Sequence, residues 1–251
     1  MPIFLPPNLL HGLAHSLPSF FREGSADGVS LLLPAFLCPL RHPALCAVGH
    51  CFCGAVLQYD GYITEFKKYH GVRIATTAFL ERTRIAVGID VGFGDVVFPE
   101  RVKMQYPTLL DDASPEIYAY SIYSTIAEKM EAIISLGVAN SRYKDFYDLC
   151  SISEREDLDG QILQKALAET FENRHTGYGS IAAFEPGFAD DESRKRRWRG
   201  FLKNKNATSL RSFADIIEDI KRLMLPPIEA LNNGRVFPYK WDHIESQWKE
   251  K

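Results

Sequence analysis

The sequence predicts a mixed fold of strands and helices, of the α/β (α+β) class. Three observations carry this prediction: apolar and polar residues alternate through residues 72–91, a helical period follows over residues 124–136, and a second short helix covers residues 142–149. A period of two residues is typical of strands, and a period near 3.6 residues is typical of helices. We therefore expect a β-hairpin followed by helices.

The predicted hairpin has its turn at residues 80–83. In the second strand the large β-branched residues share one face, so Asp90 falls on the opposite face together with the small residues Ala86 and Gly88. Asp90 has two interpretations. It is either a functional carboxylate on a face without bulky neighbours, or a strand-end residue that caps the turn at residues 92–95.

The predicted helix over residues 124–136 carries its apolar residues on one side and Glu128 and Glu131 opposite. Lys129 belongs to neither group, because at 100° per residue it lies on the flank of the apolar stripe. An ammonium group there is costly unless an anion meets it. The alternative is a buried stem that carries its charged end into water, as lysines commonly do.

The second predicted helix covers residues 142–149, and Asn140 and Ser141 are expected to cap it. Its apolar face consists of Tyr143, Phe146, Leu149 and Cys150. Two carboxylates and two cations gather on one flank of that face: Asp145, Asp148, Arg142 and Lys144. They indicate either a functional cluster or stabilisation of the first helical turn by acidic side chains.

Composition divides the chain near residue 60. Residues 1–60 contain no lysine, five charged residues and 7 of the 14 prolines, so we expect the first 50 residues or so to pack poorly. We predict three regions: a poorly specified segment (1–60), a core with the hairpin and the motif helices (61–150), and a helical C-terminal region (151–251). A zinc site is a weak possibility in the first region, because it has soft ligands without the usual spacing: Cys38, His42, Cys46, His50, Cys51 and Cys53.

Charge and cysteine content narrow the functional classes. The formal net charge of -3 excludes general coating of nucleic acid by a basic protein. The five cysteines are odd in number and unevenly spaced, so they are poorly suited to a set of disulfides. This favours a location in the reducing cytoplasm. The apolar run at residues 28–40 is interrupted by Pro34 and Pro39 and is too short for a spanning helix of about 20 residues. No membrane association is expected.

One local basic run is a candidate for RNA contact. Seven of the twelve residues from Arg194 to Lys205 are basic, and the RNA candidates among them are Arg194, Lys195, Arg196, Arg197 and Arg199. Trp198 lies within this run and has two interpretations. It either stacks on a base or packs in the core with Phe201 and Leu202, which would leave the cations as a solvated rim.

Four motifs, in order, resemble the AbiEii/AbiGii abortive-infection toxin family of nucleotidyltransferases. They are Val-Gly-Phe-Gly-Asp at 91–95, Tyr-Pro-Thr-Leu-Leu at 106–110, Ala-Glu-Lys at 127–129 and Asn-Ser-Arg-Tyr-Lys-Asp-Phe-Tyr-Asp-Leu at 140–149. The similarity extends over roughly residues 65 to 245. It implies a polymerase-β-like nucleotidyltransferase core, incomplete at its start, followed by a helical C-terminal region.

The resemblance also implies a chemistry, namely transfer of a nucleotide from a nucleoside triphosphate to tRNA or another RNA. Lys129, Asp145 and Asp148 fall on its catalytic motifs, and Arg142 and Lys144, with Lys129, are the expected nucleotide contacts. Asp90 matches the strand carboxylate expected to hold Mg²⁺. We expect Asp90, Lys129 and Asp145 to converge on one pocket, with Asp148 and Arg142 in its wall. The implied setting is phage defence by a toxin with a cognate antitoxin.

The chain also departs from the family pattern. Family members carry an Asp-x-Asp pair that provides the principal metal ligands, and no Asp-x-Asp occurs before residue 65. We expect the N-terminal catalytic half to be lost or replaced and the transfer activity to be low, because one carboxylate cannot reproduce a two-metal site. Three hypotheses stay open: an active toxin, a remnant that binds metal poorly, and a non-catalytic module that binds RNA or the antitoxin.

Overall fold

The computed structural model describes residues 3–4, 30–31, 57–62, 72–80, 82–92, 94–108, 113–205 and 211–251. Of the first 50 residues the structure describes only two short strands, at 3–4 and 30–31. The expected poor packing of this segment and its possible zinc site therefore fall outside the described residues. The chain divides into two compact units, which are described separately: His11–Asp95, and Met1–Leu10 together with Val96–Lys251. The predicted boundaries at residues 60 and 150 stay a prediction.

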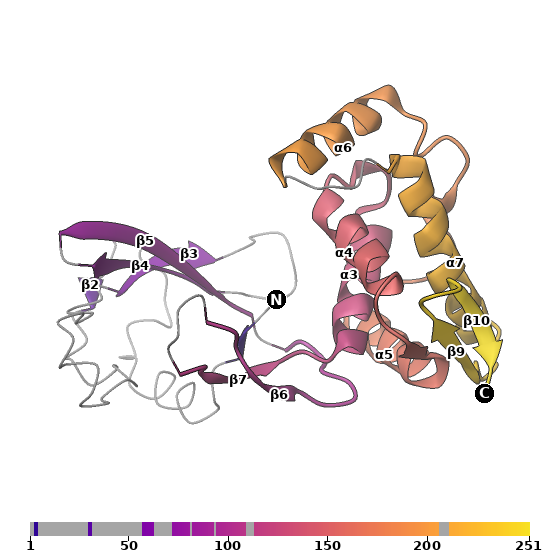
Figure 1. Cartoon of the computed structure of the whole chain (residues 1–251), viewed down its shortest axis with the longest axis horizontal. Helices are drawn as coiled ribbons and strands as arrows, with labels where there is room; N and C mark the ends of the chain where they lie inside the picture. The colour runs from indigo at the N-terminus through magenta and orange to yellow at the C-terminus, as the bar shows by residue number, and fades with distance from the viewer. Residues whose placement is uncertain are drawn as a thin grey trace. The chain divides into compact units, whose positions relative to one another are not determined.

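The unit His11–Asp95 contains one antiparallel sheet with the strand order β2-β3-β4-β5. Its strands are β2 (Ser30–Leu31), β3 (Leu57–Tyr62), β4 (Val72–Leu80) and β5 (Thr83–Val91). Strands β4 and β5 pair in continuous register from Val72 opposite Val91 to Leu80 opposite Thr83. The hairpin predicted from alternation is thus confirmed, with its turn where the polar residues indicated (Figure 1).

The other unit is mainly helical. Its long helices are α3 (Ile122–Leu136), α4 (Tyr143–Ser153), α5 (Gly160–Asn173), α6 (Glu192–Asn204) and α7 (Phe213–Asn232) (Figure 1). Two short 3-10 turns connect them, η3 (Gly137–Ala139) and η4 (Ala182–Phe184). Helix α3 packs on α4 and α5, and α7 packs on the same two helices. The mixed fold and its helical C-terminal part are confirmed, whereas likeness to a polymerase-β core stays a prediction.

Two small antiparallel sheets complete this unit. One has the order β1-β7-β6 and consists of β1 (Ile3–Phe4), β6 (Val102–Gln105) and β7 (Glu116–Ala119). The other has the order β10-β9-β8 and consists of β8 (Leu158–Asp159), β9 (Tyr239–Asp242) and β10 (Gln247–Glu250). Strand β8 leads directly into α5, so this sheet anchors the chain's last residues beside α5 and α7.

The core of the helical unit is formed by the apolar faces of these helices. Tyr143, Phe146, Leu149 and Cys150 of α4 are all buried, as the apolar pattern predicts. Phe213 of α7 packs against Phe146 with ring centroids 5.2 Å apart and an edge-on geometry that aromatic pairs favour. Within the described residues no helix is both long and apolar enough to span a membrane.

Two local predictions about the helices need correction. Glu131 was expected on the solvent side of α3, but it is 3% exposed because a later part of the chain supplies its partners. Helix α4 begins at Tyr143 without a side-chain cap. Asn140 instead accepts the N–H of Arg142 at 2.7 Å, one residue before the helix begins.

Candidate functional site

A cluster of charged side chains joins α3 to the start of α4. Lys129 extends from α3, and its side chain is 16% exposed. Its Nζ lies 3.2 Å from Asp145 Oδ1 and 2.6 Å from Asp148 Oδ2, the two carboxylates on the flank of α4. Of the two alternatives for Lys129, the one in which an anion meets the ammonium applies, because an almost buried cation is stabilised by paired carboxylates.

Two further cations complete the cluster from α4 and the residue before it. Arg142 Nε lies 2.7 Å from Asp145 Oδ2, and Lys144 Nζ lies 2.7 Å from Asp148 Oδ2. The Arg142 contact is an ion pair without hydrogen-bond alignment, since Asp145 Oδ2 has no hydrogen-bond partner among the described residues. The side chains of Arg142 and Lys144 are 56% and 57% exposed, so both cations are accessible to a dissolved anion.

The electrostatics of this charged cluster favour an ionised carboxylate at Asp148. Burial would raise the pKa of Asp148, but hydrogen bonds from Lys129 and then Lys144 outweigh it and lower that pKa below its ordinary value. Asp145 is 3% exposed and contacts two cations. Three cations and two carboxylates leave a formal charge of +1 around Lys129.

This charge balance decides which ligands suit the cluster. Proteins hold Mg²⁺ through one or two carboxylates together with substrate phosphates. Here three carboxylate oxygens already face cations, namely both of Asp145 and Oδ2 of Asp148. The cluster therefore does not fit a magnesium ion on its own. Its accessible guanidinium and ammonium groups suit phosphate oxygens instead.

Asp90, the predicted metal ligand, lies in the other compact unit. Its carboxylate accepts two hydrogen bonds from Arg73 on the neighbouring strand, at 2.7 and 2.8 Å. The Arg73 hydrogen bond is the main cause that lowers the pKa of Asp90 below its ordinary value. Because the two units are described separately, the convergence of Asp90 with Lys129 and Asp145 stays a prediction.

The basic run forms most of α6. Trp198 is 2% exposed and donates its indole N–H to the backbone oxygen of Arg211 at 2.9 Å, so the interpretation as a core residue applies. Lys195 pairs with Glu192 at 3.2 Å. Arg196, Arg197 and Arg199 are exposed, whereas Arg194 is partly buried. RNA contact by these residues stays a prediction, with the exposed cations as its strongest members.

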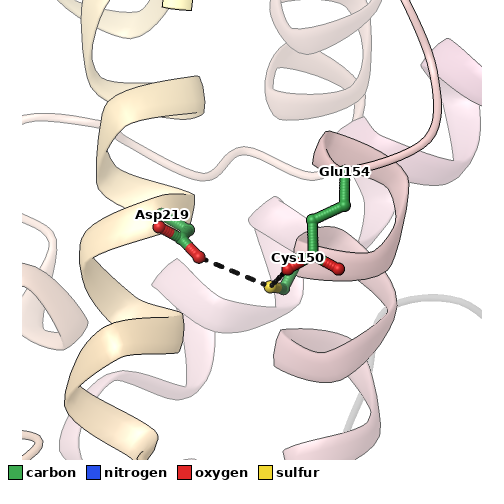
Figure 2. A group of neighbouring side chains, drawn as sticks. All are labelled: Cys150, Glu154 and Asp219. Atoms are coloured by element: carbon green, nitrogen blue, oxygen red, sulfur yellow. Dashed lines mark hydrogen bonds between the residues drawn. The ribbon is translucent and has the colours of Figure 1, made fainter. Parts of the chain in front are cut away.

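A second polar cluster, which the sequence did not reveal, joins α4 to α7. Figure 2 shows the side chains of Cys150, Glu154 and Asp219 close together. Their possible ligand atoms all lie within 4.8 Å of one another, and this is the one such group of three found among the described residues. Arg211 donates to Glu154 and to Asp219, and also to Cys150 Sγ at 3.5 Å. Burial, with the neighbouring Glu154, raises the pKa of the Cys150 thiol to about 12. A neutral thiol and an arginine among these groups do not fit a metal ion.

A third polar contact fixes α3, which carries Lys129. Glu131 accepts from Arg174 at 2.8 Å and from the Thr176 hydroxyl at 2.7 Å, both just beyond the end of α5. Both oxygens of this buried carboxylate therefore have a hydrogen-bond partner, and a buried charge without partners would be costly. The one indication of this contact in the sequence was Arg174, which lies within the stretch that resembles the toxin family.

Comparison with known proteins places the chain in a family. The family model described as nucleotidyl transferase AbiEii toxin, type IV TA system, matches residues 47–219, more than two thirds of the 251 residues. Neither the search of curated proteins nor the search of solved structures returned a match. The match includes the charged cluster and the Ala-Glu-Lys motif that carries Lys129. The chain therefore belongs to the AbiEii family of nucleotidyltransferase toxins of type IV toxin-antitoxin systems.

Proposed function

We propose that this protein transfers a nucleotide from a nucleoside triphosphate to an RNA acceptor, tRNA in the first place. We propose further that the Lys129 cluster, meaning Lys129, Arg142, Lys144, Asp145 and Asp148, binds the triphosphate. The observation that carries the proposal is a nearly buried ammonium held by two carboxylates, next to two accessible cations. Family membership supplies the reaction class.

The geometry supports different roles for these side chains. Asp145 and Asp148 both accept hydrogen bonds from the Lys129 ammonium, which fixes its position before any ligand arrives. Arg142 and Lys144 have more than half of their side-chain surface in solvent and can turn toward phosphate oxygens. A triphosphate is a strong anion, so the excess positive charge of the cluster favours its approach.

In the proposed transfer an RNA hydroxyl oxygen attacks the α-phosphorus of the triphosphate. The bond from the α-phosphorus to the bridging oxygen breaks, pyrophosphate leaves, and the hydroxyl proton passes to solvent. Positioned cations stabilise the charge that develops on the phosphate oxygens and on the leaving pyrophosphate. Lys129, Arg142 and Lys144 are the cations that would do this here.

Magnesium is expected from the family, and it supplies charge neutralisation at the phosphates. Among the described carboxylates Asp90 stays the proposed ligand, although Arg73 holds both of its oxygens. This arrangement, with the absence of an Asp-x-Asp pair before residue 65, favours a second candidate function. In that candidate the protein is a non-catalytic module that binds RNA or the antitoxin. The cytoplasm is the proposed site of action, and phage defence the proposed setting.

One experiment separates the two candidates. Purified protein is incubated with total tRNA, Mg²⁺ and each α-labelled nucleoside triphosphate, while binding of the same nucleotides is measured without RNA. Lys129→Met is compared with Lys203→Met, a matched change at an exposed lysine of α6. Label transfer that Lys129→Met abolishes and Lys203→Met retains supports the proposed enzyme. The absence of transfer supports the second candidate, and the absence of nucleotide binding contradicts the proposed triphosphate site.

A further inference from the structure

We infer that a cavity at the start of α6 binds one unpaired nucleobase of an RNA strand. The inference rests on the proposed function for the presence of RNA, and it names a part of the site that receives the acceptor. The cavity has a volume of about 430 Å³ and lies between η3, the turn after η4 and the first two turns of α6. Ligand pockets commonly have about 300 to 1,000 Å³, so this cavity has room for a nucleoside.

A fixed guanidinium forms one wall of the cavity. Arg194 donates to the backbone oxygen of Asn140 at 3.0 Å and to that of Val138. Its guanidinium carbon also lies 3.9 Å from the centre of the Phe188 ring. These three contacts hold the guanidinium group over a buried ring before any ligand arrives. Guanidinium planes stack on the unpaired bases of RNA, which makes Arg194 a stacking platform.

A buried amide supplies a hydrogen-bond donor beside this platform. Asn140 lines the cavity and is 2% exposed. Its Oδ1 accepts the N–H of Arg142, while its Nδ2 has no hydrogen-bond partner among the described residues. A buried donor without a partner is costly. A carbonyl oxygen or ring nitrogen of a base can satisfy it.

The charges around the cavity distinguish a base from a free anion. The cavity is lined by two acidic residues, Glu185 and Asp191, and by two basic residues, Arg194 and Arg197, so its wall carries both negative and positive charges. A phosphate inside would meet both carboxylates, whereas a neutral base would not. Arg197 is exposed and makes no ion pair or hydrogen bond within the described part of the chain, which leaves it available to the phosphate attached to that base.

The test compares two RNA strands of equal charge. The full chain is titrated with a labelled single-stranded decamer and with an abasic decamer of the same backbone, and binding is followed by fluorescence anisotropy. Stacking of a single base is worth about 1–3 kcal/mol, so we expect the strand with bases to bind at least about fivefold tighter. Ala139→Trp fills the cavity without a change of charge, and Asn140→Asp keeps the acceptor for Arg142 but removes the donor.

Both variants should remove the preference for the strand with bases. Ala139→Trp, which adds no charge, should also leave binding of the abasic strand within about twofold. Arg196→Gln is the matched control, because it changes an exposed arginine of α6 outside the cavity. This variant should weaken the binding of both strands equally and keep the ratio of their two dissociation constants unchanged. Equal binding of both strands by the unchanged protein, or a preference that survives in Ala139→Trp, overturns the inference.

Together with the binding experiment, the nucleotide-transfer assay shows whether the base pocket or the proposed catalysis is wrong. If labelled nucleotide still enters tRNA while the two strands bind equally, the base pocket is wrong and the nucleotidyltransferase stands. If the preference depends on Ala139 and Asn140 but no label is transferred, the pocket stands and the proposed catalysis is wrong. Thermal unfolding of each variant, followed by circular dichroism, confirms that a loss of binding does not reflect a loss of fold.

Discussion

Replacement of Lys129 by methionine tests the charged cluster without any assumption about activity. The change keeps the apolar stem and removes the ammonium that lies 3.2 Å from Asp145 and 2.6 Å from Asp148. Breaking a buried ion pair commonly costs about 3–5 kcal/mol, because one charge is left buried without a partner. Here Arg142 and Lys144 still contact the two carboxylates, so we expect a smaller loss of about 2–3 kcal/mol.

Urea unfolding followed by tryptophan fluorescence measures this loss in the relevant unit. All three tryptophans, Trp198, Trp241 and Trp248, lie in the helical unit that contains the cluster. A loss of 2–3 kcal/mol should lower the midpoint by about 1 M urea. The matched control Lys203→Met removes an exposed ammonium and should change the free energy of unfolding by less than about 0.5 kcal/mol.

A double-mutant cycle isolates the interaction between Lys129 and Asp148. Asp148→Asn alone and the combined variant should give a coupling energy of about 1–2 kcal/mol, since the two groups are in direct contact. Additivity within about 0.3–0.5 kcal/mol would refute the claim that the ammonium and this carboxylate stabilise each other.

The dependence on pH provides a second check on the same cluster. The pKa of Asp148 is lowered in the fold, so its contribution is present above the unfolded value of about 3.9. The contribution is lost as the pH falls through the lower folded value. The stability difference between the unchanged protein and Lys129→Met should therefore shrink below about pH 4. A difference that stays constant into that range contradicts the assigned role of Asp148.

Three further predictions concern stability and reactivity. Gly160→Ala should destabilise the protein by about 1–3 kcal/mol or more in a urea titration, because its Cβ would lie 2.7 Å from the Phe237 ring and 2.8 Å from the Tyr239 backbone oxygen. Ser212→Ala removes half of a capping box at the start of α7 and should lower the thermal midpoint, at a cost of about 1 kcal/mol. Cys150 should escape alkylation by iodoacetamide at pH 8 in the folded protein, since its pKa is about 12, and peptide mass mapping would contradict this by finding it modified as fast as in urea.

The hairpin and the apolar face of α4 could be predicted because both depend on neighbours in sequence. Alternation fixes which residues of β5 share a face, and pairing with β4 follows from a turn of minimal length. A core position for Trp198 was likewise one of two interpretations that the sequence offered. Phe201 and Leu202 follow it by three and four residues and so lie on the same side of a helix.

Contacts between distant segments could not be predicted in this way. Glu131 follows the polar spacing of α3, yet it is buried because Arg174, 43 residues later, reaches it. Arg194 counts as one more cation in a basic run, but in the fold it donates to backbone oxygens more than 50 residues earlier. Composition and periodicity record which side chains are charged, whereas the position of their partners is set by tertiary packing.

Asn140 connects the two parts of the proposed site. Its backbone oxygen accepts from Arg194, which forms the wall of the base pocket, and its side-chain oxygen accepts the N–H of Arg142. Arg142 in turn pairs with Asp145, which holds Lys129. One short loop therefore fixes the proposed base pocket and the proposed triphosphate contacts at once. A shift of that loop would displace both, so the motif at residues 140–149 has a structural reason to keep its asparagine as well as its charges.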